Sequence, residues 1–164
     1  MKITLYMAVS ADGFIAGPND ETPWSDEEWE AFQTFIRSCD VVLLGRRTYE
    51  IMRDQSEFVA GPEYIIATRN ASFDTGSFRK LSIKSKADLP QAERLGVIGG
   101  GELNGTLAAL GAFDAIILDV EPVILGTGKR LFGNHTVHLN LELIASRKLG
   151  SGTVQNHYLI RDDV

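Results

Sequence analysis

Short, largely apolar runs alternate with helical patterns along most of the chain. Runs of this length and composition predict buried strands at residues 3–9, 41–44, 64–67, 95–98 and 115–120. Ser25 and Glu28 have the spacing of a capping box, which predicts a helix ending near Ser38. Further helices are expected to begin after Gly45 and after residue 101. Strands that alternate with helices favour a mostly parallel α/β sheet.

The C-terminal part has a different pattern. Residues 137–148 and 153–160 alternate between apolar and polar, and a glycine-rich turn at 150–152 separates them. This predicts an antiparallel β-hairpin at the C-terminal end of the sheet. Weaker patterns indicate a strand at 78–83 and a helical turn at 86–91. We expect a single domain covering residues 1–164.

Composition narrows the classes of partner. The 164 residues carry a formal net charge of −6 and contain no basic block, so nucleic acid is not an expected partner. No apolar stretch approaches the roughly 20 residues of a membrane span, and a cytoplasmic protein is predicted. Cys39 is the single cysteine, which excludes an intramolecular disulfide. The three histidines lie late in the chain, apart from the glycine-rich turns, and predict no metal site.

The most informative stretch is the glycine run at residues 99–101. It follows the strand at 95–98 and precedes a helix marked by Leu103, Leu107 and Leu110. A strand, a turn without side chains and a helix N-terminus form an anion site, for which a pyrophosphate is a suitable ligand. A simple tight turn is the alternative. Asn104 replaces the third glycine of the dinucleotide fingerprint, which disfavours a standard Rossmann domain.

Two other predicted strands end in comparable residues. The first is followed by residues 45–48 (GRRT) and the second by residues 68–70 (TRN). The carboxyl ends of parallel strands meet at one edge of a sheet, where ligands of α/β proteins collect. Arginine suits bidentate phosphate contacts, although each arginine alone also fits an ordinary solvated surface charge.

Four segments in this order resemble the dihydrofolate reductase-like superfamily, and most closely the reductase domain of bacterial riboflavin biosynthesis. They are residues 10–16 (SADGFIA), 45–50 (GRRTYE), 97–103 (VIGGGEL) and 122–128 (PVILGTG) with the following Leu131 and Phe132. The resemblance implies a mixed, mostly parallel sheet flanked by helices, with a C-terminal antiparallel hairpin. It also implies NADPH as the cofactor.

By motif position, the resemblance implies a set of cofactor contacts. Ala8 and Val9 would lie beside the nicotinamide. The phosphates would be held at the second helix by Gly45, Arg46, Arg47 and Thr48. Thr68 and Arg69 would meet the adenosine ribose and its 2′-phosphate. The pyrophosphate would be received by Gly100, Gly101, Glu102 and Leu103, and Ile98 and Gly99 would also contact the cofactor.

The substrate side matches less closely. Dihydrofolate reductases carry a carboxylate on the first helix after a Pro-Trp pair, but here the spacing from Trp24 places Trp29 at that position. Asp26, Glu27 and Glu28 are expected on other faces of the helix, so folate reduction is not favoured.

Asp12 is the candidate substrate-facing residue and proton donor, with an Asp-Gly turn as the alternative. The resemblance and the aromatic content suggest further residues of the substrate pocket, with ordinary core packing as the alternative for the aromatic ones. These are Trp24, Tyr49, Gly126 and Phe132.

The sequence therefore predicts an NADPH-dependent oxidoreductase that transfers hydride to a small, pyrimidine- or pterin-like heterocycle. It is similar to 5-amino-6-(5-phosphoribosylamino)uracil reductase. The alternative is a non-catalytic NADP(H)-binding or scaffold domain of the same fold. Related reductases pair through their C-terminal strands, and the predicted hairpin ends at a sheet edge, so a homodimer is expected.

Overall fold

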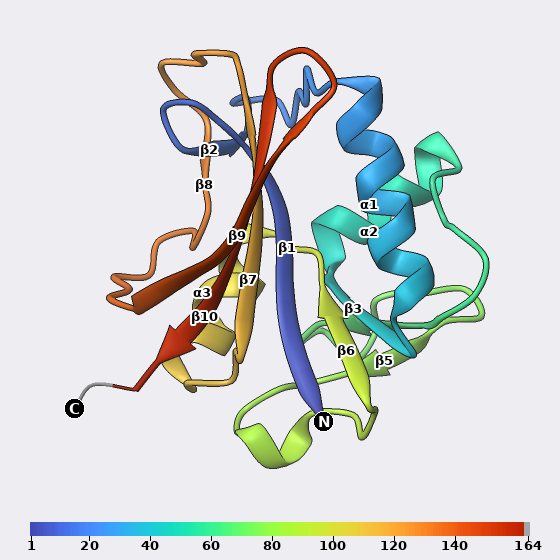
Figure 1. Cartoon of the computed structure of the whole chain (residues 1–164). Coiled ribbons are helices and arrows are strands. Elements are labelled where there is room, and N and C mark those ends of the chain that lie inside the picture. The colour runs from blue at the N-terminus through green and yellow to red at the C-terminus, as the bar shows by residue number, and fades with distance from the viewer. Residues whose placement is uncertain (163–164) are drawn as a thin grey trace.

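A computed structural model describes residues 1–162 (Figure 1). In this part of the chain the main sheet contains eight strands in the order β5-β4-β3-β6-β1-β7-β10-β9. Their bounds are β1 Lys2–Ser10, β3 Val41–Gly45, β4 Glu63–Ala67, β5 Arg79–Leu81, β6 Arg94–Val97, β7 Ala115–Glu121, β9 Asn140–Leu149 and β10 Thr153–Arg161.

The strand directions agree with the predicted fold class. β1 pairs in parallel with both β6 and β7, and β3 pairs in parallel with both β4 and β6. β10 runs antiparallel to β7 on one side and to β9 on the other. A mostly parallel sheet with an antiparallel C-terminal hairpin is therefore confirmed.

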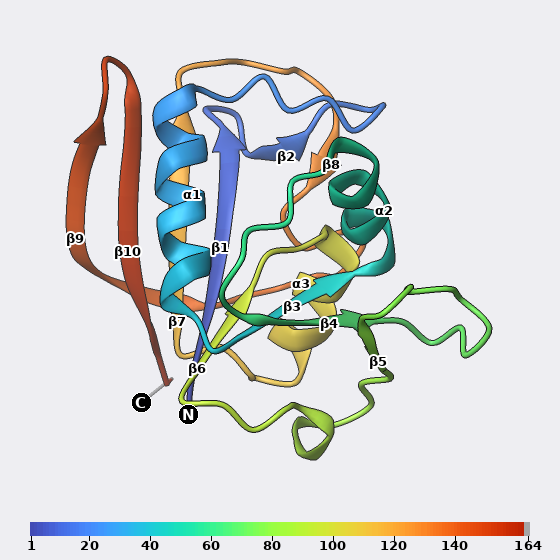
Figure 2. The same ribbon diagram turned by 90° about the vertical axis from the view of Figure 1, so that its right-hand side faces the viewer.

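Helices cover both faces of the sheet (Figures 1 and 2). Helix α1 (Asp26–Ser38) and helix α2 (Arg46–Gln55) lie on one face, and helix α3 (Gly101–Ala109) lies on the other. Two apolar clusters fill the two interfaces. One contains Leu103 and Leu107 of α3, and the other contains Ile36 of α1 and Met52 of α2.

The structure departs from the predicted elements where the chain packs without forming a long strand. β9 begins at Asn140 and not at residue 137, because Val137 and Leu139 pack on the apolar cluster beside α3 from a loop at 137–139. β5 spans Arg79–Leu81, and the helical turn η1 spans Lys86–Asp88. A small second sheet pairs β2 (Phe14–Ala16) with β8 (Lys129–Arg130), and strands this short leave no readable pattern.

The start of α1 is tied to the sheet. The Ser25 hydroxyl accepts a hydrogen bond from the Glu28 amide at 3.2 Å, as an N-cap should. The Ser25 amide and hydroxyl donate to the two carboxylate oxygens of Glu121 on β7, each at 3.0 Å. A capping box would also have the Ser25 amide donate to the Glu28 side chain. This part of the prediction is wrong, because the Glu28 side chain turns toward the sheet and is only 5% exposed.

None of the helices in residues 1–162 has the length and apolar character needed to cross a membrane.

Candidate active site

A cavity of about 1530 Å³ opens along the carboxyl ends of the central parallel strands. It extends from the first half of α1 to the N-termini of α2 and α3, and its wall includes Tyr6, Glu28, Gly45, Thr68 and Gly100. Pockets for one drug-sized ligand measure roughly 300–1000 Å³. The cavity therefore has room for two molecules side by side.

Two helix N-termini meet at one end of this cavity. Gly45 is the N-cap of α2 and Gly100 is the N-cap of α3. The Gly45 amide donates to the Gly99 carbonyl at 2.7 Å, which holds the two turns together. The first amides of each helix have no carbonyl partner inside the helix and carry the positive end of its dipole. This end of the cavity can bind an anion.

A loop from the C-terminal half of the chain closes over the start of α3. A Cβ atom at Gly101 would lie 2.4 Å from the Arg130 carbonyl oxygen and 2.7 Å from the Gly133 amide nitrogen, so only glycine allows this approach. The loop brings Lys129 and Arg130 into the cavity wall. Neither residue was predicted to lie at the site, because nothing in their local pattern indicates contact with a distant glycine turn.

His135 lies on the same loop and corrects a prediction. Like the other two histidines, it was expected apart from the glycine-rich turns. The structure instead places it in the cavity wall beside α3, with Nε2 3.4 Å from the Glu102 carboxylate. Within residues 1–162, no group of three or more His, Cys, Asp or Glu side chains is arranged to hold a metal ion.

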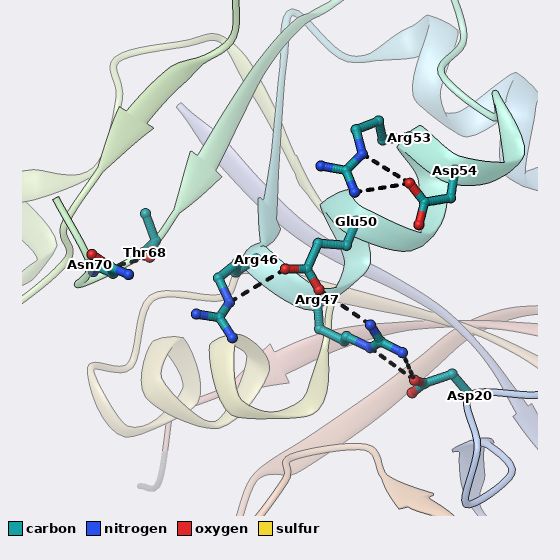
Figure 3. Close-up of polar contacts among 8 residues, drawn as sticks. All are labelled: Asp20, Arg46, Arg47, Glu50, Arg53, Asp54, Thr68 and Asn70. Carbon is teal, nitrogen blue, oxygen red and sulfur yellow. Dashed lines mark hydrogen bonds and ion pairs between the residues drawn. The ribbon is translucent and has the colours of Figure 1, made fainter. Parts of the chain in front are cut away.

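The arginines near α2 differ in how firmly they are held (Figure 3). Arg47 donates to Asp20 through Nε and Nη2, at 2.9 and 2.8 Å, and to Glu50 at 3.2 Å. Arg46 makes only a long ion pair with Glu50, at 3.8 Å, and its guanidinium lies over the Phe73 ring. The guanidinium of Arg46 is therefore more available to a ligand than that of Arg47.

The turn after β4 presents a third arginine. The Thr68 hydroxyl accepts from the Asn70 amide at 3.1 Å, which shapes the turn that carries Arg69 (Figure 3 shows Thr68 and Asn70). Arg69 lines the cavity and has no hydrogen bond or ion pair within the described part of the chain. It is exposed and free to bind an anion.

The opposite end of the cavity is acidic. Glu28 lines it, and behind Glu28 the carboxylates of Asp119 and Glu121 are buried between α1 and the sheet. Burial, together with the charges of Asp119 and Glu121, raises the pKa of Glu28 from 4.5 to about 8. Glu28 and Asp26 were expected on other faces of the helix, but the structure places both in the cavity wall, while Glu27 lies outside it.

Asp12 lies outside the cavity wall. Its carboxylate accepts hydrogen bonds from the Ser10 hydroxyl at 2.7 Å and from the amides of Leu125 and Gly126 at 3.1 and 2.8 Å. These donors hold the pKa of Asp12 below its ordinary value, with the Ser10 hydroxyl making the largest contribution. The geometry supports the alternative of a turn residue, which joins the 10–13 and 125–126 loops.

The other predicted site residues divide into two groups. Those that the structure places in the cavity wall are Ala8, Gly45, Arg46, Arg47, Thr48, Thr68, Arg69, Ile98, Gly100, Gly101, Glu102, Leu103 and Trp24. Those outside the wall, besides Asp12, are Val9, Gly99, Tyr49, Gly126 and Phe132.

The two aromatic residues outside the wall belong to the core. Tyr49 is buried among the rings of Phe58, Phe73 and Phe78. Phe132 packs on the apolar cluster on the α3 side. Their packing follows the alternative of ordinary core residues.

Known proteins resemble this chain over nearly its whole length. The model of the RibD C-terminal domain matches residues 85–155. The uncharacterized protein YwjB of Bacillus subtilis is 31% identical over 172 aligned positions, which cover 96% of this chain and 97% of that protein.

Two solved structures share the fold. A putative riboflavin biosynthesis protein from Shewanella has a TM-score of 0.79 at 17% identity and covers 99% of this chain and 100% of its own. Dihydrofolate reductase from Enterococcus faecalis, solved with NADP(H), has a TM-score of 0.72 at 18% identity and covers 98% and 97%.

The sheet topology and these two structures show that the chain has the dihydrofolate reductase-like α/β fold. Among proteins of this fold, the chain belongs to the RibD C-terminal domain branch, and YwjB is its relative over nearly the whole length. Its fold is shared with dihydrofolate reductase from Enterococcus faecalis.

Proposed function

We propose that the protein is an NADPH-dependent reductase that transfers hydride to a small heterocycle of the pyrimidine or pterin kind. The main support is one continuous cavity, which has a basic, glycine-rich end and an acidic end. One end suits an anionic dinucleotide, and the other suits an uncharged or N–H-rich ring. We also propose that the protein is cytoplasmic and that its substrate is a small molecule.

The basic end fits the cofactor on three counts. Two helix N-termini meet there, the turns at Gly45 and Gly100 carry no side chain, and a Cβ at Gly100 would make only an ordinary contact, 3.6 Å from the Thr48 hydroxyl. The backbone is thus open to a pyrophosphate. Arg46 and Arg69 would bind the 2′-phosphate, which NADH lacks. When bound, NADPH supplies the hydride.

Glu28 is the proposed proton donor at the acidic end. Its carboxyl group lines the cavity, and its raised pKa of about 8 keeps it protonated at neutral pH. Hydride addition to the carbon of a C=N bond leaves the nitrogen in need of a proton. The Glu28 O–H can deliver that proton and regain one from water. Asp12, the donor expected from the sequence, is held away from the cavity by its turn contacts.

The test is NADPH oxidation by the purified protein against a panel of dihydropterins, aminopyrimidines and simple carbonyl compounds. We expect turnover with a ring compound, and we expect Glu28→Gln to reduce it at least tenfold. Glu30→Gln, an exposed change on the same helix, is the matched control. Cofactor binding without turnover of any compound would favour the non-catalytic NADP(H)-binding domain instead.

We also propose that two copies pair through the C-terminal hairpin. β9 is the last strand at its edge of the sheet, and its Leu143 and Ile144 are 54% and 53% exposed. An edge with exposed apolar side chains favours pairing with another chain. Sedimentation should show a dimer at micromolar concentration and a monomer for Leu143→Arg. A monomeric wild-type protein would contradict the pairing.

A further inference from the structure

Three carboxyl groups crowd the space beneath the first half of α1, and their hydrogen bonds are unequal. Glu121 receives three donors, namely the Ser25 amide and the hydroxyls of Ser25 and Thr153. Asp119 receives the Tyr6 hydroxyl on Oδ2, while its Oδ1 is buried without a partner in the part of the chain described. The Glu28 carboxyl group has no hydrogen bond or ion pair within residues 1–162.

The surrounding charged groups do not balance these acids. Asp119 pairs in register with Gln155 of β10, and Gln155 in turn with Arg147 of β9. Arg147 is exposed and donates to the Gln155 side chain at 2.9 Å instead of reaching a carboxylate. His157 also contacts Gln155, at 2.8 Å, and burial lowers its pKa, which favours the neutral ring. No cation is in hydrogen-bond contact with Glu28, Asp119 or Glu121 among the described residues.

Acids this close and this buried cannot all be ionised, because each added charge costs desolvation and repels the others. The proton must settle on the group with the poorest support for its negative charge. Glu121 has three donors and Asp119 has the Tyr6 hydroxyl, so the proton settles on Glu28.

We propose that Asp119 is a positioning residue whose buried, Tyr6-bound carboxylate keeps Glu28 protonated where Glu28 faces the cavity. Asp119 is 0% exposed and does not line the cavity, so it acts through Glu28 and not on the substrate. The use of this role in catalysis rests on the proposed function. The protonation of Glu28 does not, since it is a property of the free protein.

The decisive experiment is a ¹³C NMR titration of the free protein, labelled at the δ-carboxyl carbon of glutamate. Glu28→Gln identifies the Glu28 signal. We expect its midpoint near pH 8 in the wild type and lower by about one pH unit or more in Asp119→Asn, as for removal of a nearby like charge. Glu30→Gln should leave it unchanged. An ordinary midpoint in the wild type, or an unchanged one in Asp119→Asn, would overturn the role of Asp119.

A second measurement covers the case in which Asp119→Asn does not fold. In wild-type protein labelled at the aspartate γ-carboxyl carbon, the Asp119 signal should inflect at the Glu28 midpoint. That inflection should vanish in Glu28→Gln. If no aspartate signal senses Glu28, the two groups are not coupled and the role of Asp119 is refuted.

Turnover separates this inference from the proposed function. If both hold, the alkaline limb of the kcat/KM profile moves to lower pH in Asp119→Asn, because Glu28 then loses its proton earlier. If Glu28 titrates in a way that depends on Asp119 but the protein turns over no substrate, the role of Asp119 stands and the proposed reductase activity is refuted.

Discussion

Replacing Glu28 by glutamine removes the titration of a carboxyl group that the fold keeps protonated. In the folded state the pKa of Glu28 is about 8, against an ordinary 4.5. Between these two values the folded protein binds more protons than the unfolded chain. The wild type should therefore lose stability as pH rises, by about 1.4 kcal/mol per unit.

From pH 5 to pH 8 this loss amounts to about 3.5 kcal/mol, which is a large part of the stability of a domain. Glu28→Gln has nearly the same shape as protonated Glu28 and does not titrate. It should match the wild type at about pH 5 and exceed its free energy of unfolding by several kcal/mol at about pH 8.

The assay is urea denaturation followed by circular dichroism at a series of pH values for the wild type, Glu28→Gln and the exposed control Glu30→Gln. The difference between wild type and Glu28→Gln should open steadily with pH, while the control follows the wild type. Parallel curves for wild type and Glu28→Gln would refute the inward-facing, protonated Glu28.

The remaining predictions concern the cofactor end and the core. Arg69→Ala should weaken NADPH binding by about 10- to 100-fold and leave NADH binding unchanged, because one charge-assisted contact is lost. Arg53→Ala, on α2 and paired with Asp54, is its control, and equal losses for both cofactors would argue against a 2′-phosphate contact. Gly100→Ala should keep its stability, since a Cβ there makes only an ordinary contact, but should bind NADPH more weakly in a fluorescence titration. Unimpaired binding would mean that the glycine turn at residues 99–101 does not contact the cofactor. Tyr6→Phe should cost about 1–3 kcal/mol in urea unfolding, because it leaves the buried Asp119 without its donor. A negligible cost would show that this hydrogen bond is not formed.

Most of the sheet was predictable because its central strands are buried on both faces. Val42, Leu43 and Leu44 are fully buried in β3, and a run of this kind has few other uses in a domain of this size. The glycine turns after β3 and β6 were predictable for a related reason. A turn without side chains between a strand and a helix has a small set of structural meanings.

The acidic end of the cavity was not predictable from local pattern. Glu28 stands three residues after Ser25, where a capping box accounts for it fully. Besides burial, the charges that raise its pKa belong to Asp119 and Glu121 on β7, which are far from Glu28 in the sequence. Hydrophobic patterning assigns every glutamate to the surface, so it cannot predict a buried acid of this kind.

The approach of the segment from residue 128 to residue 135 to the start of α3 was not predicted, for a similar reason. Its basic and polar residues look like an ordinary surface connection, and the signal for their position lies elsewhere. Gly101 is the partner that allows the loop to approach, and the two segments meet only in the folded chain.

Binding of NADPH in preference to NADH is tested by titrating the purified protein with NADPH and, separately, with NADH. The fluorescence of Trp24 and Trp29, which both line the cavity, should report binding. We predict saturable quenching by NADPH and a markedly lower affinity for NADH. Absence of binding for both cofactors would contradict a reductase, although the fold and the family would stand.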